Sequence, residues 1–162
     1  MKSKRLRIGD VIRIPLPKGK KTFAHFLHKD KWGDIVVVHD YLVDSTDEED
    51  LEAIIDTKIK FGPILTRLKV GMNLAEFDWD IVGNIPVIDF KYPNFIWKEG
   101  ANLTAGITTR WYLYDGETNK LIGQKLPVEY KKLEYLANYS PQALINRIVT
   151  GNYLEKGLIE KG

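Results

Sequence analysis

Cysteine is absent from the 162-residue chain, and this absence excludes several kinds of site at once. Without thiols the protein has no disulfide, no cysteine-ligated zinc or iron–sulfur centre and no cysteine nucleophile. Hydrophobic runs are short, because stretches such as Ile35–Val38 fall far below the ~20 residues that span a bilayer. The basic N-terminus meets Ile8-Gly9-Asp10 before any apolar signal-peptide core begins. We therefore expect a cytoplasmic protein that does not enter a membrane.

The motifs of the common enzyme classes are also missing. The chain contains no Gly-x-Ser-x-Gly, no phosphate-binding Walker loop and no His-Glu-x-x-His. Serine is scarce, and Ser45 and Ser140 each precede a segment of helical character, where a capping residue is expected. We therefore expect no serine catalysis, no cofactor and no small-molecule substrate.

One pair of carboxylates keeps an enzymatic alternative open. Asp78 and Asp80 flank Trp79, and on a strand the two carboxylates would share a face, a spacing that glycosidases can use. The same alternation fits a solvated strand face with Phe77, Trp79 and Ile81 turned inward. The second interpretation needs only one assumption, so we expect a protein that is not an enzyme, with a carboxylate-dependent glycosidase as an alternative.

Three histidines, His25, His28 and His39, fall in neighbouring predicted strands. On a straight strand His25 and His28 point to opposite faces because side chains alternate, so a shared metal would require a bulge. We expect histidines at the surface of the sheet or hydrogen-bonded within it rather than a metal site.

Composition and patterning indicate one α+β domain over residues 1–162, since 44% of the residues are hydrophobic and eighteen are aromatic. Strand patterns joined by short turns predict an antiparallel meander, part of a small SH3-like barrel, over residues 10–16, 22–28 and 35–43. Further strands are predicted at 64–68, after Gly62-Pro63, and within 77–86. A last hairpin is predicted from 108–114 and 120–125, after a loop-rich stretch that includes Pro93, Phe95 and Trp97.

Three helices are predicted. The first is short and acidic, with Leu51, Ile54 and Ile55 on its apolar face, and two capping-box patterns precede it, Ser45–Glu48 and Thr46–Glu49. The second begins near Pro127, and its apolar positions recur at helical spacing at Tyr130, Leu133, Leu136 and Ala137. The third begins at Ser140-Pro141 and ends at Gly151.

The net charge of +2 conceals a strong asymmetry along the chain. Residues 1–32 carry a surplus of eight positive charges, and the remainder carries a surplus of six negative ones. Seven acids without an intervening base fall within residues 44–56, here called the acidic segment. A solvated helix face explains part of this pattern, but such a field also steers a basic protein partner. The candidate partner-binding residues are Asp44, Asp47, Glu48, Glu49, Asp50 and Glu52.

The basic N-terminal strands raise an alternative function, nucleic-acid binding. Its candidate residues, which combine phosphate-binding cations with a stacking surface, are Lys18, Lys20, Lys21, Lys29, Lys31 and Trp32. Lysine at turns and sheet edges also serves simply to keep strands soluble and unpaired. No signature of a known nucleic-acid-binding fold is present, so this function ranks second.

Several short strings occur in a telling order: Ile8-Gly9-Asp10-Val11-Ile12-x-Ile14-Pro15-Leu16-Pro17-x-Gly19, Trp79-x-Ile81-Val82-Gly83-x-x-Pro86, Trp111-Tyr-Leu-Tyr-Asp115, Ile122-Gly123 and Leu126-Pro127-x-Glu129-Tyr130. Together they resemble the immunity protein 26 family of bacterial polymorphic toxin systems. The resemblance implies a non-enzymatic α+β protein that binds a cognate toxin and blocks its active site or substrate groove. It supplies no functional-residue motif, and the glycines, prolines and tryptophans of these strings are expected to be structural. A nuclease toxin would be basic because it binds phosphate, which suits an acidic partner surface.

Overall fold

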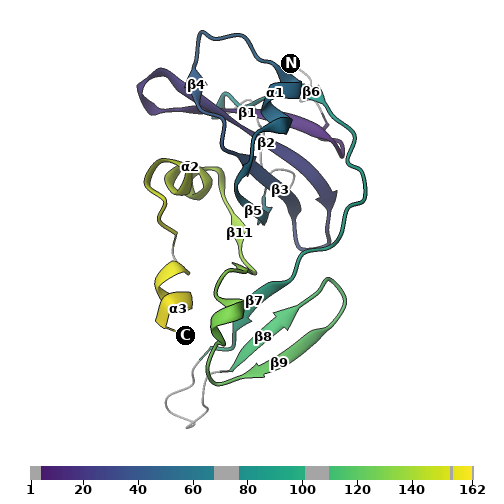
Figure 1. Ribbon diagram of the computed structural model, residues 1–162, viewed down its shortest axis with the longest axis vertical. Coiled ribbons are helices and arrows are strands. Elements are labelled where there is room, and N and C mark those ends of the chain that lie inside the picture. Colours follow the sequence, from purple (N-terminus) through teal and green to yellow (C-terminus); the bar gives the residue numbers. More distant parts are fainter. Residues whose placement is uncertain (1–4, 68–76, 101–109, 154, 162) are drawn as a thin grey trace. The chain divides into compact units, whose positions relative to one another are not determined.

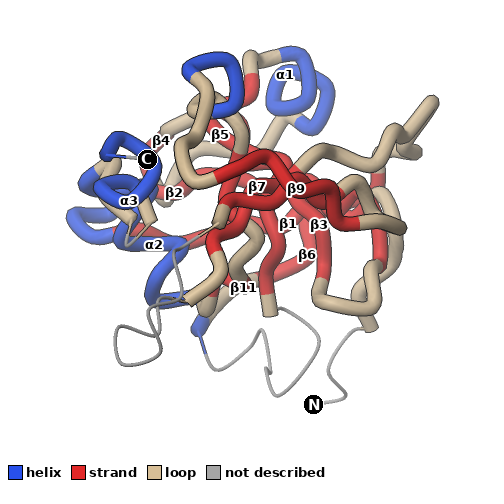
Figure 2. The backbone as a smooth tube through the Cα atoms, turned by 90° about the horizontal axis from the view of Figure 1, so that it is seen from below, coloured by secondary structure: helices blue, strands red, loops and turns tan. Residues whose placement is uncertain are grey.

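A computed structural model describes residues 5–67, 77–100, 110–153 and 155–161, and its fold is mixed α+β, as the sequence predicts. Strands predominate over short helices (Figure 2). The chain divides into two compact units, the first within residues 1–90 and 137–151 and the second within 91–136 and 152–162. The single domain expected over residues 1–162 stays a prediction, because two interleaved units are compatible with one domain or with two.

The first unit is built on one seven-stranded sheet (Figure 1). Its strands are β1 (Asp10–Leu16), β2 (Lys20–Lys29), β3 (Asp34–His39), β4 (Val43–Asp44), β5 (Ile59–Thr66), β6 (Asp80–Asn84) and β11 (Asn138–Tyr139). The order across the sheet is β11-β5-β3-β2-β1-β6, and β4 pairs with the first residues of β2. All pairs are antiparallel except β11 with β5. The predicted antiparallel meander is therefore confirmed for β1, β2 and β3.

The interior of this sheet follows the hydrophobic pattern closely. Ile35–Val38 of β3 is buried throughout, as expected of a strand covered on both faces. Strand β5 corrects one prediction, because it runs from Ile59 through Gly62-Pro63 instead of starting at Ile64, and its pairing with β3 is irregular there. The predicted end of that strand at Leu68 lies outside the described residues. Neither sheet closes into a barrel among the described strands, so the SH3-like barrel stays a prediction.

Two helices belong to the first unit, α1 (Leu51–Asp56) and α2 (Pro141–Thr150). The predicted cap of α2 is confirmed, because the Ser140 hydroxyl accepts from the Ala143 N–H at 3.2 Å and Gly151 ends the helix in the left-handed region. For α1 the predicted caps are wrong, since the N-cap is Asp50. The residues of the expected capping box are held elsewhere, as the Ser45 N–H donates to the Gly19 carbonyl beside the β4–β2 pair.

The second unit contains a four-stranded sheet of order β10-β7-β8-β9 and the helix α3 (Lys156–Lys161). The strands are β7 (Phe95–Lys98), β8 (Trp111–Tyr114), β9 (Asn119–Gly123) and β10 (Glu134–Tyr135). The β8–β9 hairpin confirms the prediction, whose residues 108–109 lie outside the described part. A buried hydrophobic cluster of the unit contains Ile96, Trp111, Leu126 and Ile159. None of the helices in the described part of the chain is long and apolar enough to cross a membrane.

Two sequence predictions in this region are wrong. The stretch around Phe95 and Trp97 is a strand rather than a loop, because β8 supplies it with an antiparallel partner. The helix expected from Pro127 to Ala137 is a short 3-10 turn at Val128–Tyr130 followed by β10. Parallel pairing of β10 with β7, continued by the Leu136 N–H to the Ile96 carbonyl at 2.8 Å, takes the backbone groups that a helix would use.

Candidate functional site

Folding brings the acidic segment against the basic N-terminal hairpin. Arg13 of β1 donates from Nη1 to Glu49 Oε1 at 2.8 Å, and Lys21 Nζ reaches the same oxygen at 3.1 Å. Lys20 pairs with Asp44 where β4 lies against β2. The charge asymmetry of the sequence is therefore partly cancelled inside the first unit.

Lys21 is the most enclosed member of this cluster. Its side chain is only 4% exposed, and its ammonium also donates to the Asp47 backbone carbonyl. The pKa of Glu49 is lowered, first by the hydrogen bond from Arg13 and then by Lys21, so the carboxylate form is favoured. The hydrogen bond to Asp44 raises the pKa of Lys20. Lys21 is thus enclosed and committed to Glu49 and the Asp47 carbonyl, whereas the ion pair of Lys20 with Asp44 stays exposed to solvent.

The remaining acids divide into two groups. Two of them order the backbone: Asp47 accepts from the Asp44 N–H at 3.1 Å, and Asp50 accepts from the Ala53 N–H at 3.2 Å as the cap of α1. The second group is exposed and has no ion pair within the described residues, and its members are Glu48, Glu52 and Asp56. We call these three the outward acids.

Helix α1 anchors the acidic segment to the sheet. Ile54 is fully buried in a cluster with Val11 and Phe23, and Leu51 and Ile55 pack around it. Leu51 lies so close to Gly83 of β6 that a Cβ at position 83 would come within 2.3 Å of its Cδ1. The predicted apolar face of α1 is confirmed, and the small residue at 83 is what admits the helix.

The first two resemblance strings meet in the β1–β6 ladder. Val11 is paired with Gly83, and the Asn84 amide donates to Asp10 Oδ1 at 2.9 Å. Gly9 has φ of +94° and exchanges backbone hydrogen bonds with Phe26 and Ile85. The strings therefore contribute structure to one region, as expected of them.

The six residues proposed for nucleic acid lie in two places. Lys18, Lys20 and Lys21 are at the start of β2, and Lys29, Lys31 and Trp32 are at its far end. Seven residues of β2, 22–28, lie between Lys21 and Lys29 and separate the two groups by roughly 25 Å. They do not form one surface, and only the second group keeps solvent-facing cations around an aromatic ring.

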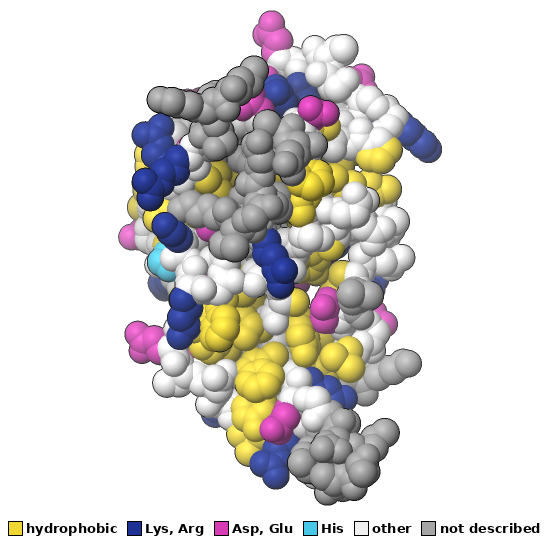
Figure 3. All heavy atoms as spheres, turned by 180° about the vertical axis from the view of Figure 1, so that it is seen from behind, with side chains coloured by type: hydrophobic (Ala, Val, Ile, Leu, Met, Phe, Trp, Pro, Cys, Tyr) yellow, Lys and Arg dark blue, Asp and Glu magenta, His cyan; other side chains and the backbone are white. Residues whose placement is uncertain are grey.

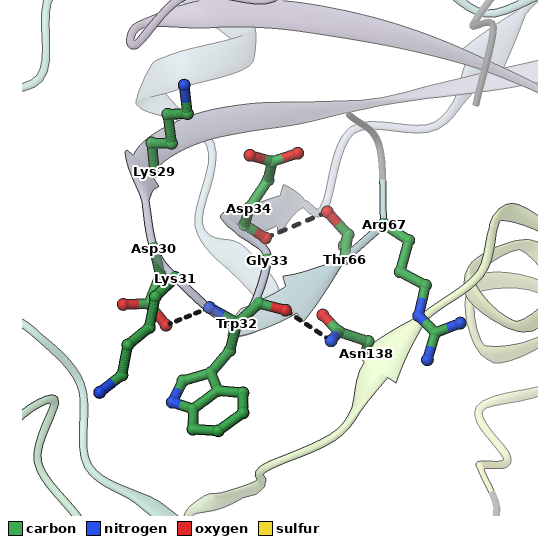
Figure 4. A pocket seen from close by; sticks show the side chains of 9 residues that line it. All are labelled: Lys29, Asp30, Lys31, Trp32, Gly33, Asp34, Thr66, Arg67 and Asn138. Atoms are coloured by element: carbon green, nitrogen blue, oxygen red, sulfur yellow. Dashed lines mark hydrogen bonds between the residues drawn. The ribbon is translucent and has the colours of Figure 1, made fainter. Parts of the chain in front are cut away.

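That second group lines a cavity of about 360 Å³, here called the Trp32 cavity (Figure 4). The hairpin loop between β2 and β3 forms one wall, and Thr66 and Arg67 at the end of β5 form another. Asn138 of β11 completes it and holds the loop by donating from Nδ2 to the Trp32 carbonyl at 2.6 Å. Sequence reasoning missed Arg67 and Asn138, because the pairing of β5 with β3 brings Arg67 beside the loop and the pairing of β11 with β5 brings Asn138 there.

Two of the three histidines are hydrogen-bonded within the sheet, as expected. His25 Nε2 lies 2.8 Å from the Ile85 carbonyl, and His39 Nδ1 lies 3.0 Å from the Thr57 carbonyl. His28 stacks on Phe90 with the ring centroids 4.7 Å apart. A bulge does interrupt β2 between Phe26 and His28, yet no group of three metal-ligating side chains occurs among the described residues.

The carboxylate pair does not share a strand face. Asp78 has φ of +58° and precedes β6, which begins at Asp80. Asp80 lies 3.5 Å from Arg13. The inward alternation holds for Trp79, which is 3% exposed, but Phe77 is 38% exposed because the strand starts after it. The geometry on which the glycosidase alternative depended is therefore absent from these residues.

Comparisons with protein-family models, with curated proteins and with solved structures find no match to this chain.

Proposed function

We propose that this protein is an immunity protein that neutralises a cognate bacterial toxin by stoichiometric binding, with the outward acids as part of its contact surface. The observation that carries the proposal is the ordering of the acidic segment. Arg13, Lys20 and Lys21 fix this segment to the sheet, while Glu48, Glu52 and Asp56 stay exposed to solvent. A surface ordered before binding loses less conformational entropy when a partner docks.

The charge of this surface favours a basic partner. Seven acids against three ion-paired cations leave a surplus of four negative charges on and around α1. Such a surplus raises the rate of encounter with a positively charged protein and disfavours negatively charged ones. A nuclease toxin, which carries positive charge to bind phosphate, is the partner class that we favour. We also propose that the protein is located in the cytoplasm and that its first sheet is related to SH3-like barrels.

The resemblance to the immunity protein 26 family supports the same function through the placement of its residues. Gly9, Gly83 and Trp79 lie in or beside the β1–β6 ladder on which α1 rests. The first two strings therefore contribute to the part of the sheet on which the acidic segment rests. Neutralisation would follow from occlusion, since a domain seated over the active site or substrate groove of a toxin excludes its substrate without chemistry of its own.

Co-expression with the toxin encoded beside this gene tests the proposal. We expect cells that produce both proteins to survive, and we expect a complex with one copy of each to be isolated by size-exclusion chromatography. Cells that produce the toxin without this protein should not survive. Absence of both protection and complex would show that the function is a different one.

A further inference from the structure

The Trp32 cavity presents an indole ring on a loop that is held in place. Trp32 is 53% exposed, although its backbone is anchored at both ends. Its N–H donates to Asp30 Oδ2 at 3.3 Å, and its carbonyl accepts from Asn138. Gly33, next in the chain, has no room for a side chain, because a Cβ there would come within 2.3 Å of Asn138 Oδ1. The loop is therefore fixed by packing while the ring faces solvent.

Three exposed cations, Lys29, Lys31 and Arg67, line the Trp32 cavity. Lys31 Nζ lies 5.5 Å from the centroid of the Trp32 ring, and Lys29 and Arg67 are exposed on opposite sides of the cavity (Figure 4). The cavity also contains two acids, but their placement differs from that of the cations. Asp34 is 3% exposed, and the Asp30 carboxylate accepts from the loop backbone. Lys29, Lys31 and Arg67 are exposed, whereas Asp30 is half-buried and Asp34 is buried.

We propose that the Trp32 cavity binds a nucleotide, with the base stacked on Trp32 of one wall and the phosphate held by Arg67 of the other wall. The volume of 360 Å³ falls in the range of about 300–1,000 Å³ that is typical of small-ligand pockets. A planar guanidinium such as that of Arg67 suits phosphate oxygens through paired hydrogen bonds. A base offers a flat face to an indole whatever its identity, so stacking tolerates all bases. Free nucleotides and single-stranded nucleic acid present this same chemistry.

This inference is independent of the proposed toxin-binding function. The cavity is lined by residues from the far end of β2, the end of β5 and β11, whereas the outward acids lie on and before α1. No residue belongs to both sites. Failure of toxin binding and failure of nucleotide binding would therefore be separate results.

Isothermal titration calorimetry on the full chain tests the proposal with four probes. These are adenosine 5′-monophosphate, a short single-stranded oligoadenylate, adenosine and inorganic phosphate. We expect the monophosphate or the oligoadenylate to bind more tightly than either adenosine or phosphate alone, since neither fragment uses both parts of the cavity. Preference for the oligomer would identify a strand as the source, and equal molar affinity would identify the free nucleotide. Equal binding of phosphate and the monophosphate would overturn the stacking role and with it the proposal.

Matched variants locate the binding. Trp32→Ala should weaken nucleotide binding by about fivefold or more, as expected for loss of a stacked base. Arg67→Gln should weaken it by about fivefold and make it less dependent on salt. Lys60→Gln removes the same charge near the other end of β5. It should change neither the affinity for nucleotide nor the salt dependence of binding. Thermal unfolding of each variant checks the fold. Affinities unaffected by the first two variants, or no binding of any nucleotide at millimolar concentration, would refute the site.

Discussion

At the scale of single residues, the fold places several titratable groups where their chemistry is restricted. Glu49 accepts from both Arg13 and Lys21, so one carboxylate joins two strands to the acidic segment. His39 is 5% exposed, and its Nε2 has no hydrogen-bond partner among the described groups, while Nδ1 faces a backbone carbonyl. Burial of this imidazole favours its neutral form, because a charged ring would lose its hydration.

His39 should make stability depend on pH. Its pKa is lowered from 6.5, mainly by burial and further by the charge of His25, although the hydrogen bond to Thr57 acts in the opposite direction. The unfolded chain therefore binds this proton first as the pH falls, and folding weakens below about pH 6.5. The free energy of unfolding of the unsubstituted protein, measured in urea, should decrease from neutral pH to about pH 5. The decrease should be smaller for His39→Gln.

The matched control for this prediction is His28→Gln. His28 is half-buried and stacks on Phe90 instead of facing another histidine. The pH dependence would be assigned to His39 if the free energy of unfolding changes with pH as steeply in His28→Gln as in the unsubstituted protein, and less steeply in His39→Gln. Identical slopes for the parent and His39→Gln would contradict it.

At the scale of elements, pairing between distant segments decides where helices and strands begin. The sequence Ser45–Glu48 matches the capping-box pattern. However, Val43 and Asp44 pair with β2, and the helix starts only after Asp50. The apolar spacing after Pro127 is helical, yet β7 takes Glu134 and Tyr135 as a parallel neighbour. In both cases a sheet edge formed by remote residues satisfies the backbone groups first.

The attachment of the acidic segment to the sheet should depend on Glu49. Glu49→Gln replaces the carboxylate of two ion pairs by a neutral amide and leaves the buried Lys21 ammonium without its carboxylate partner. We expect the free energy of unfolding to fall by about 1–3 kcal/mol. Because the pKa of Glu49 is lowered from 4.5, this stabilisation is present above that pH and is lost as the pH falls further.

Denaturant unfolding at neutral pH measures this loss, and hydrogen exchange shows whether α1 is the part that opens. Glu48→Gln is the control, since its side chain is exposed and is expected to change stability by less than about 0.5 kcal/mol. Equal stabilities for the two variants would mean that the ion pairs of Glu49 do not hold the segment.

At the scale of the whole molecule, charge is redistributed by folding. The sequence has a positive beginning and a negative remainder, but the first unit pairs members of each, and Lys, Arg, Asp and Glu side chains are spread over the face in Figure 3. After this pairing, a local surplus of negative charge remains around the outward acids. Reversing Glu49 or Asp50 would therefore damage the fold, whereas the outward acids can be changed with little structural effect.

Reversal of the outward acids tests their part in toxin binding. The double variant Glu48→Lys/Glu52→Lys should slow association with a basic toxin by about tenfold at low ionic strength, with a smaller effect at high salt. Stopped-flow or surface plasmon resonance measures this rate. Glu117→Lys/Glu129→Lys introduces the same charge at exposed positions of the second unit and serves as the control. Equal slowing by both variants would show that net charge matters rather than this surface.

The sequence by itself determined the elements whose signals are local: the β1–β2–β3 meander with its buried Ile35–Val38 run, the apolar face of α1, and α2 with its Ser140 cap and Gly151 end. Side-chain period and capping chemistry are properties of a few adjacent residues. It also identified the charged segments, but it did not separate Lys29, Lys31 and Trp32 from the other residues proposed for nucleic acid.

Only the tertiary structure decided which charges meet and which stay free. The ion pairs of Glu49, the gathering of Arg67 and Asn138 beside Trp32, and the parallel strands β10 and β11 all join residues far apart in the chain. No local pattern encodes such contacts, because each depends on the register of a sheet assembled from several segments. The outward acids and the Trp32 cavity are two surfaces that this assembly leaves exposed, and our two binding proposals rest on them.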